Sequence, residues 1–175
     1  YASYGDSSMR GAYRSIGINR NDFCALIQMR PGKQADCGCL EWLAFASNAF
    51  NVLAPFYADV EETPEYLANT TGEVSTDNFY WTSRMIAAMA DASYSKSLIH
   101  VERCQEQVAA KSYELLNRYD ALLEKETDAA ARKALRQEAN RAVADMVKKE
   151  LSGTLDKVLY ELSGQMKNAY SRSDA

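Results

Sequence analysis

The chain has 175 residues, of which 47% are hydrophobic and 25% charged, and its formal net charge at pH 7 is -4. This length fits one domain with a substantial core, and the composition excludes an intrinsically disordered protein. An excess of acidic over basic residues, 24 against 20, argues against nucleic acid as the main partner. No apolar stretch reaches the length of about 20 residues that a membrane span needs. Four cysteines without an obvious disulfide framework favour a reducing compartment, and we expect a cytoplasmic protein.

Residues 1–62 read as the sheet portion of the molecule. Alternation of apolar and polar residues in "YRSIGIN" predicts a strand over 13–19, and a turn at 20–22 joins it to the next strand as a hairpin. That second strand, "FCALIQMR" (23–30), is a continuous apolar run, which is typical of a strand covered on both faces. Two further strands are predicted over 39–47 and 50–57, the latter stopped or bent by Pro55.

Residues 63–175 read as helix. Pro64 at a first helical position, with Thr63 as its N-cap, predicts a short helix. A medium helix is predicted over 78–92, with its N-cap among Ser75, Thr76 and Asp77 and a buried face of Trp81, Met85, Ala88, Met89 and Ala92. From Ser95 onward, two long apolar stripes separated by the polar stretch 124–129 predict an antiparallel helical hairpin, with Thr127 or Asp128 as the second N-cap.

Strands first and helices after indicate an α+β single domain, in which a sheet packs against helices. Four strands in one layer need a second sheet or an added half of the protein for their other face. The sequence therefore suggests that polypeptide belonging to the fold is missing from this chain.

Few residue patterns carry chemistry by themselves. His100 and Cys104 share a helical face and, with Cys37 and Cys39, make a nominal zinc quartet, but the C-x-C spacing is unusual for zinc and we expect no metal site. The sequence has no G-x-S-x-G nucleophile elbow and no phosphate-binding glycine loop. Three acids that follow a predicted strand form either a functional cluster or solvated surface: Asp59, Glu61 and Glu62.

Three stretches, taken in order and spacing, resemble the C-terminal half of the bacterial dipeptidase A family. They are "YRSIGINRNDFCALIQMRP", "EWLAFASNAFNVLAPFYADVEETPEYLANTT" and "STDNFYWTSRMIAAMADASY". The resemblance covers nearly all of residues 5–175 and is strongest over 10–95. It implies a cysteine-type N-terminal-nucleophile hydrolase, an αββα sandwich of two stacked sheets between helical layers, and no cofactor.

In that family an N-terminal cysteine attacks the peptide carbonyl while its own α-amine acts as general base. This sequence departs from the pattern, because it begins at Tyr1 and none of its cysteines is N-terminal. The resemblance therefore implies a single-domain fragment whose catalytic N-terminal half is absent. We expect the nucleophile upstream and no dipeptide hydrolysis by the isolated chain.

The resemblance also suggests site residues. The family's Y-R-x-I pattern falls on Tyr13 to Ile16, which makes Arg14 the candidate supporting arginine beside the nucleophile. A guanidinium there favours a thiolate and suits a substrate carboxylate, whereas the alternative is a salt bridge at the sheet edge. Asn48 and Arg84 are weaker candidates for substrate binding, and Arg10 reads as surface.

Two functions remain open. The first is a fragment of a cysteine dipeptidase that acts on unmodified dipeptides, with the upstream half of the same protein and further copies of the chain as partners. The alternative is a helical interaction or oligomerisation module without catalysis. A fragment should expose unpaired strand edges and apolar faces, whereas a module should be stable alone.

Overall fold

The computed structural model of the chain describes residues 6–9, 11–12 and 21–166. Its elements, in chain order, are η1 (Ser7–Met9), β1 (Phe23–Met29), η2 (Ala35–Cys37), β2 (Cys39–Phe45), β3 (Ala54–Tyr57), α1 (Glu65–Ala68), α2 (Phe79–Ala92), α3 (Tyr94–Leu123) and α4 (Ala129–Ser163). This order confirms an α+β protein with an antiparallel sheet followed by helices. The strand predicted over 13–19, and its hairpin, lie outside the described residues.

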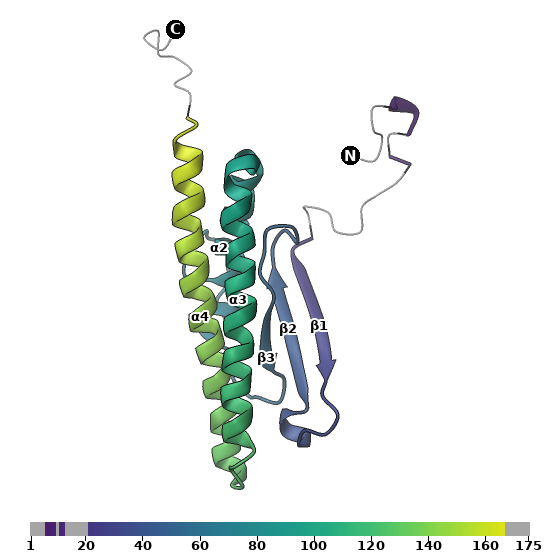
Figure 1. The fold of residues 1–175 in the computed structure, drawn as a ribbon, viewed down its shortest axis with the longest axis vertical. Helices are drawn as coiled ribbons and strands as arrows, with labels where there is room; N and C mark the ends of the chain where they lie inside the picture. Colours follow the sequence, from purple (N-terminus) through teal and green to yellow (C-terminus); the bar gives the residue numbers. More distant parts are fainter. Residues whose placement is uncertain (1–5, 10, 13–20, 167–175) are drawn as a thin grey trace.

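The described strands form one antiparallel sheet in the order β1-β2-β3. Its register places Trp42 of β2 between Leu26 of β1 and Pro55 of β3. Strand β3 lies beside the long helices, and β1 lies farthest from them (Figure 1). The sheet therefore extends sideways from the helical layer, and the strands differ greatly in how much the helices cover them.

The edge at β3 is closed by a side chain of α4. Asn140 is buried; its Oδ1 accepts a hydrogen bond from the Tyr57 backbone N–H at 2.8 Å, and its Nδ2 donates to the Tyr57 carbonyl at 3.0 Å. The amide thus makes the pair of bonds that a neighbouring strand would make. Pro55 neither stops nor bends this strand, contrary to the sequence prediction, because an edge strand tolerates a residue without an N–H.

No strand among the described residues pairs with the outer edge of β1. All seven of its residues are exposed, and its large apolar side chains keep half or more of their surface in solvent: Phe23 55%, Leu26 52%, Ile27 59% and Met29 70%. The apolar run predicted a strand covered on both faces, but nothing among the described residues covers it.

The medium helix α2 confirms the predicted span but presents a different face. Its N-cap is Asn78, whose Oδ1 accepts from the Trp81 backbone N–H at 2.8 Å, rather than one of the three preceding residues. The buried residues of α2 are Phe79, Thr82, Ser83, Ile86, Ala87 and Ala90. The predicted face was wrong because small residues let α2 approach its neighbours closely, whereas Trp81 bonds to the Thr71 carbonyl at the surface.

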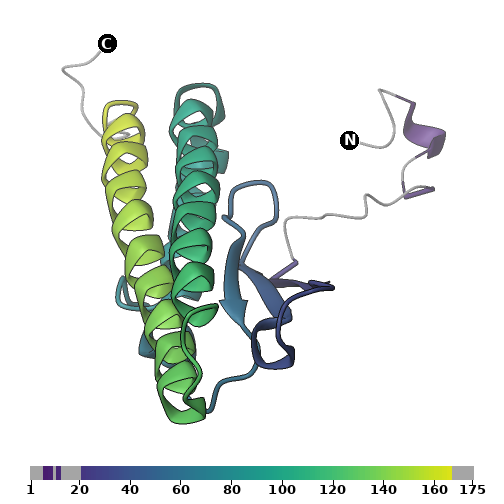
Figure 2. The same ribbon diagram turned by 60° about the horizontal axis from the view of Figure 1, so that its bottom comes forward.

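The predicted hairpin is confirmed by α3 and α4, which lie side by side and antiparallel (Figures 1 and 2). Asp128 caps α4, accepting from the Ala131 N–H at 2.8 Å, and the short first helix begins after Pro64 rather than Thr63. The main core joins α2, α3, α4 and β3, and a second cluster packs β2 and β3 on the hairpin near its turn. Within the described residues, no helix combines the length and apolar character that crossing a bilayer requires.

Replacing Asn140 with Ala should lower the free energy of unfolding of the chain by about 2–4 kcal/mol, because a buried N–H and a buried carbonyl lose their partner. Urea unfolding followed by circular dichroism measures this loss. Arg141→Ala is the matched control: its exposed ion pair with Glu62 predicts a change below about 1 kcal/mol. Equal losses in the two variants would contradict the role given to Asn140.

Candidate functional site

The sequence candidates fall into two groups. Arg14 and Arg10 lie outside the described residues, so their placement stays a prediction. Asn48 and Arg84 are described, Asn48 in the loop that follows β2 and Arg84 on α2. Both lie at the end of the sheet where β1 begins and β2 ends, which we call the Asp22 end.

Two contacts assemble the Asp22 end. The Ala46 backbone N–H donates to the Asp22 carbonyl at 2.9 Å, which joins the exit of β2 to the entry of β1. Arg84 Nη1 donates to Asp22 Oδ1 at 3.1 Å, which ties α2 to the same point. The Arg84 side chain is 38% exposed, so this pair lies at the surface. The structure therefore brings Arg84 beside the segment that leads into β1.

The loop of residues 46–51 is rigidly held. Ala46 has φ 65°, a left-handed conformation that is uncommon for a residue with a Cβ, and it is fully buried. Its carbonyl accepts from Asn51 Nδ2 at 3.1 Å, and Gln105 Nε2 of α3 donates to the Asn51 carbonyl at 2.9 Å. Strained backbone that its surroundings over-determine clusters at functional sites.

Asn48 sits in this loop with an unusual amide. Its Oδ1 is buried and has no hydrogen-bond partner among the described residues. An orphaned buried carbonyl oxygen costs about 1–3 kcal/mol. Neither this orphan nor the left-handed Ala46 has a local sequence signal, since no glycine or turn motif marks positions 46–48. Asn48 was predicted as a residue that could donate a hydrogen bond to substrate, and the strained backbone beside it was missed.

The opposite end of the sheet holds a buried ion network. Arg132 donates to both carboxylate oxygens of Asp36 at 2.7 Å, and Arg136 Nη1 lies 2.5 Å from the same carboxylate. Arg132 also donates to the carbonyls of Leu123 and Glu126, and Arg136 to the carbonyl of Asp59. The hydrogen bonds from Arg132 hold the pKa of Asp36 below its usual value. Sequence analysis missed this network, although the i, i+4 spacing of the two arginines puts them on one face of α4.

A second cluster lies next to it. Asp120 of α3 accepts from Arg30 Nη1 and from the Tyr57 hydroxyl, each at 2.7 Å, and Lys33 approaches it at 3.4 Å. Burial and the neighbouring Asp120 raise the pKa of Tyr57 above its ordinary value, so the phenol stays protonated. A cavity of about 260 Å³ opens between these groups and Arg132. The charged groups at this end of the sheet are paired with one another. We therefore interpret them as structural contacts that hold the sheet against the α3–α4 hairpin.

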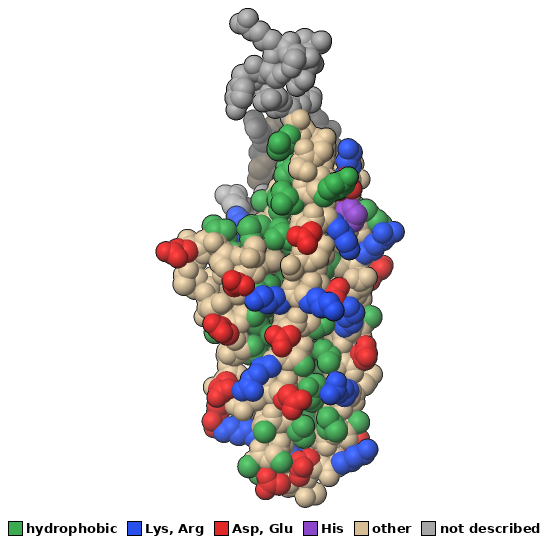
Figure 3. Space-filling view, turned by 90° about the vertical axis from the view of Figure 1, so that its left-hand side faces the viewer, with side chains coloured by type: hydrophobic (Ala, Val, Ile, Leu, Met, Phe, Trp, Pro, Cys, Tyr) green, Lys and Arg blue, Asp and Glu red, His purple; other side chains and the backbone are tan. Residues whose placement is uncertain are grey.

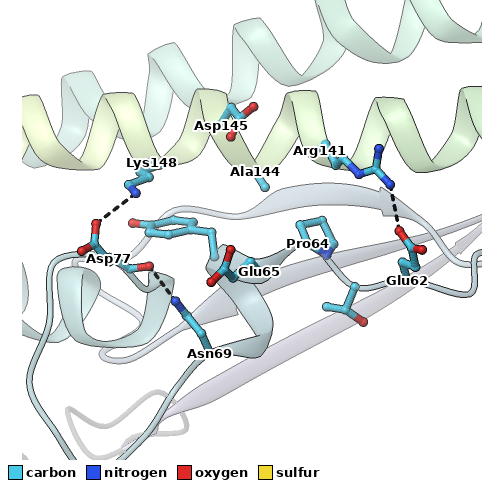
Figure 4. A pocket seen from close by; sticks show the side chains of 11 residues that line it. Glu62, Pro64, Glu65, Asn69, Asp77, Arg141, Ala144, Asp145 and Lys148 are labelled. Carbon is cyan, nitrogen blue, oxygen red and sulfur yellow. Dashed lines mark hydrogen bonds and ion pairs between the residues drawn. The ribbon is translucent and has the colours of Figure 1, made fainter.

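Another cavity, of about 570 Å³, lies between α1 and α4 (Figure 4). Ion pairs close both ends of it: Arg141 to Glu62 at 2.8 Å and Lys148 to Asp77 at 3.0 Å. Asn69 donates to the Asp77 carbonyl at 3.0 Å. Both cations at the rim, Arg141 and Lys148, are thus paired with acids of the same chain.

The three acids lie at the surface, as the second of the two predicted alternatives has it, and each contacts a basic residue of α4. Asp59 approaches Arg136 at 3.4 Å, Glu61 approaches Lys133 at 2.5 Å, and Glu62 pairs with Arg141. Each acid has its own basic partner. They point along the helix as separate contacts and do not converge on a shared ligand.

The cysteines and the histidine do not assemble a catalytic or zinc site in the described part of the chain. Cys37 belongs to the core cluster near the hairpin turn, whereas Cys104 belongs to the main core, where burial raises the pKa of its thiol. His100 lies 3.4 Å from Glu161, and no group of three or more His, Cys, Asp or Glu residues among those described could hold a metal ion. The zinc alternative is therefore wrong for these residues.

Comparisons with known proteins bear on the whole chain. Residues 1–107 match the family model described as Peptidase family C69. The chain is 36% identical over 174 residues to a probable dipeptidase A of Streptococcus pyogenes serotype M3, and 33% identical over 211 residues to a dipeptidase of Bifidobacterium longum. These matches cover 99% of this chain but 36% and 40% of the two relatives. The chain thus spans little more than a third of the length of the curated relatives it matches.

Asp36→Asn should lower the free energy of unfolding by about 2 kcal/mol near neutral pH, because two buried guanidinium groups lose their counter-charge. The partial exposure of Asp36 keeps this loss below that expected for a fully buried ion pair. The lowered pKa means that the carboxylate stabilises the fold above pH 3.8, the ordinary value, and that this contribution disappears as pH falls through the lowered value. Urea unfolding of both proteins between pH 7 and pH 2.5 measures the difference. We expect the difference to shrink below pH 3.8; a difference independent of pH would contradict the ionic role of Asp36.

Proposed function

The chain belongs to peptidase family C69, and we propose that it forms the non-nucleophile part of a cysteine dipeptidase that hydrolyses unmodified dipeptides. The observation that carries the proposal is the 36% identity, over nearly the whole chain, to a protein named probable dipeptidase A. The thiol nucleophile would come from polypeptide outside this chain. The complete fold would be a sandwich of two sheets between helical layers, in a cytoplasmic protein.

The proposed reaction is a two-step acyl transfer. The thiol attacks the peptide carbonyl and passes its proton to the α-amine of the same cysteine, which returns it to the departing amine. Water then hydrolyses the thioester and releases the second amino acid. Among the described residues no hydrogen bond joins a cysteine to His100, which supports a nucleophile supplied from elsewhere. The chain alone would be inactive.

The Asp22 end of the sheet is the place we propose for substrate. Arg14 lies a few residues before β1 in the sequence, and its proposed role is to favour the thiolate and to receive the dipeptide carboxylate. Asn48, on the rigid loop 46–51, would hydrogen-bond the substrate's polar groups. Arg84, fixed by Asp22, would add positive charge to the same end.

The apolar strand β1, which no described residue covers, favours this proposal over the interaction module, because a self-sufficient module would cover such a strand. A homo-oligomer remains part of the proposal on a separate observation. Ile99, Leu159, Tyr160 and Met166 are exposed near the end of the hairpin where His100 meets Glu161. Figure 3 shows apolar side chains there, whereas basic and acidic groups intersperse along the rest of that face.

The protein expressed from the open reading frame that encodes this chain should hydrolyse unmodified dipeptides. Arg14→Ala in that protein should lower kcat/KM about 100-fold or more, because a positive charge beside the reacting thiol stabilises the transition state. Amino acid release from a dipeptide panel measures the rate. Arg103→Ala, an exposed arginine of α3, is the matched control and should keep wild-type activity. Full activity of the Arg14→Ala protein would contradict a role in catalysis and favour the alternative, a salt bridge of Arg14 at the sheet edge.

Asn48→Ala in the same frame should lower kcat/KM about 10-fold or more with an unchanged melting temperature, because the amide oxygen has no hydrogen-bond partner within the described chain that the substitution would remove. Steady-state kinetics and thermal unfolding separate the two effects. Asn117→Ala, exposed on α3, is the matched control. Loss of stability together with activity would identify Asn48 as a structural residue instead.

A further inference from the structure

The cavity between α1 and α4 has no part in the proposed reaction. Its volume, about 570 Å³, is within the range of small-molecule sites, and its walls come from α1, α4 and the segments on either side of α1. None of the residues that line it belongs to the Asp22 end of the sheet. A ligand in this cavity would therefore occupy a site separate from the one proposed for dipeptides.

The charges that line the cavity do not balance. Four carboxylates stand against two basic groups, and both basic groups are already paired with acids at the two ends of the cavity. The two carboxylates left over are Glu65 of α1 and Asp145 of α4, which lie on opposite walls (Figure 4). Neither of them has an ion-pair or hydrogen-bond partner in the part of the chain that the structure describes. The cavity thus carries two negative charges without a counter-ion.

Two buried oxygens in the same lining also lack partners. Tyr66 lines the cavity with a side chain that is only 6% exposed, and its hydroxyl makes no hydrogen bond to any described residue. The Oδ1 atom of Asn69 is likewise buried and without a partner there, although its Nδ2 donates to the Asp77 carbonyl at 3.0 Å. Buried polar atoms in folded proteins are nearly always hydrogen-bonded. Two such oxygens in one cavity therefore point to a ligand that supplies donors.

The wall that carries the Tyr66 hydroxyl is held in place before any ligand enters. The Tyr66 ring stacks on Phe79, with centroids 5.8 Å apart and planes 8° apart, and Lys148 Nζ lies 5.8 Å from the centroid of the same ring. Ala144 of α4 is buried in the lining, and its methyl group leaves room that a larger side chain would fill. A preformed site of this kind costs a ligand little ordering of the protein.

The unsatisfied groups define the chemistry of the ligand. Two carboxylates and an amide oxygen are hydrogen-bond acceptors, and a tyrosine hydroxyl can accept as well. A metal ion fits poorly, because no group of three or more His, Cys, Asp or Glu residues along the described chain could hold one. A primary ammonium group offers three N–H donors and one positive charge, so that it matches both the acceptors and the excess of negative charge.

We propose that the α1–α4 cavity binds the primary ammonium group of a small organic molecule between Glu65 and Asp145. Asn69 and Tyr66 supply further acceptor oxygens. Diamines and the α-ammonium group of amino acids and peptides share this chemistry, and the choice of probes separates the two sources. The proposal goes beyond the dipeptidase reaction and does not depend on it.

Isothermal titration calorimetry on the protein expressed from the complete reading frame tests the proposal. The probes are cadaverine, a diamine, and L-alaninamide, an α-ammonium compound without a carboxylate, and glutarate is the control of opposite charge. We expect at least one of the two cations to bind with a dissociation constant of about 1 mM or tighter, and glutarate not to bind. The tighter of the two cations identifies the source of the ammonium group.

Substitutions in the lining locate the binding. Glu65→Gln and Asp145→Asn keep the size of each side chain and remove its charge, so each should weaken binding of the tighter probe about tenfold or more, since a charge-assisted hydrogen bond is lost. Asp156→Asn, an exposed acid elsewhere on α4, is the matched control and should bind like the parent. Arg141→Ala removes a positive charge from the rim and should strengthen binding about twofold or more.

The opposite results would overturn the proposal. These are no binding of either cation to the parent protein, unchanged binding by both Glu65→Gln and Asp145→Asn, or weaker binding by Arg141→Ala. Melting temperatures confirm that the variants are folded, and a strengthened Arg141→Ala complex still supports the proposal if one carboxylate variant does not fold. Dipeptide hydrolysis is measured separately, so an inactive protein that binds the cation would remove the proposed function and leave this inference standing.

Discussion

The arrangement of this chain depends on how α4 holds the sheet. Asn140 occupies the hydrogen-bonding positions beside Tyr57 that a further strand would take, and Arg132 and Arg136 clamp Asp36 in the connection between β1 and β2. Asn140 and both arginines are buried, Asp36 is partly buried, and all three helix residues come from one face of α4. One helix thereby fixes the position of β3 and the far end of the β1–β2 pair.

This attachment leaves the other end of the sheet for chemistry. The network around Asp36 and Asp120 satisfies its charges internally, whereas the Asp22 end carries the left-handed Ala46 and the unpartnered Asn48 amide. A rigid anchor at one end and unsatisfied groups at the other agree with a scaffold that presents a site. Membership of a peptidase family supports the proposed reaction, in which the nucleophile would come from polypeptide outside this chain.

The sequence predicted the element order well because long stripes and strong caps such as Asp128 record local structure. The sequence-based prediction failed where contacts with distant elements determine which residues are buried. The buried face of α2 follows Thr82, Ser83 and Ala87, which no hydrophobic pattern marks, and Pro55 is tolerated because β3 is an edge. Asn48 and Arg84 were named individually, but their common location arises from the Ala46–Asp22 contact between distant strands. Arg14 stays a prediction.

The closed edge at β3 also limits how copies of this chain can aggregate. Open-ended stacking of sheets needs two adhesive edges on every molecule, so that each unit binds one neighbour and still offers a place to the next. In the described sheet Asn140 blocks one of the two. As far as the described strands extend, edge pairing between copies would therefore end at two molecules, because the side chain of one asparagine occupies the second edge.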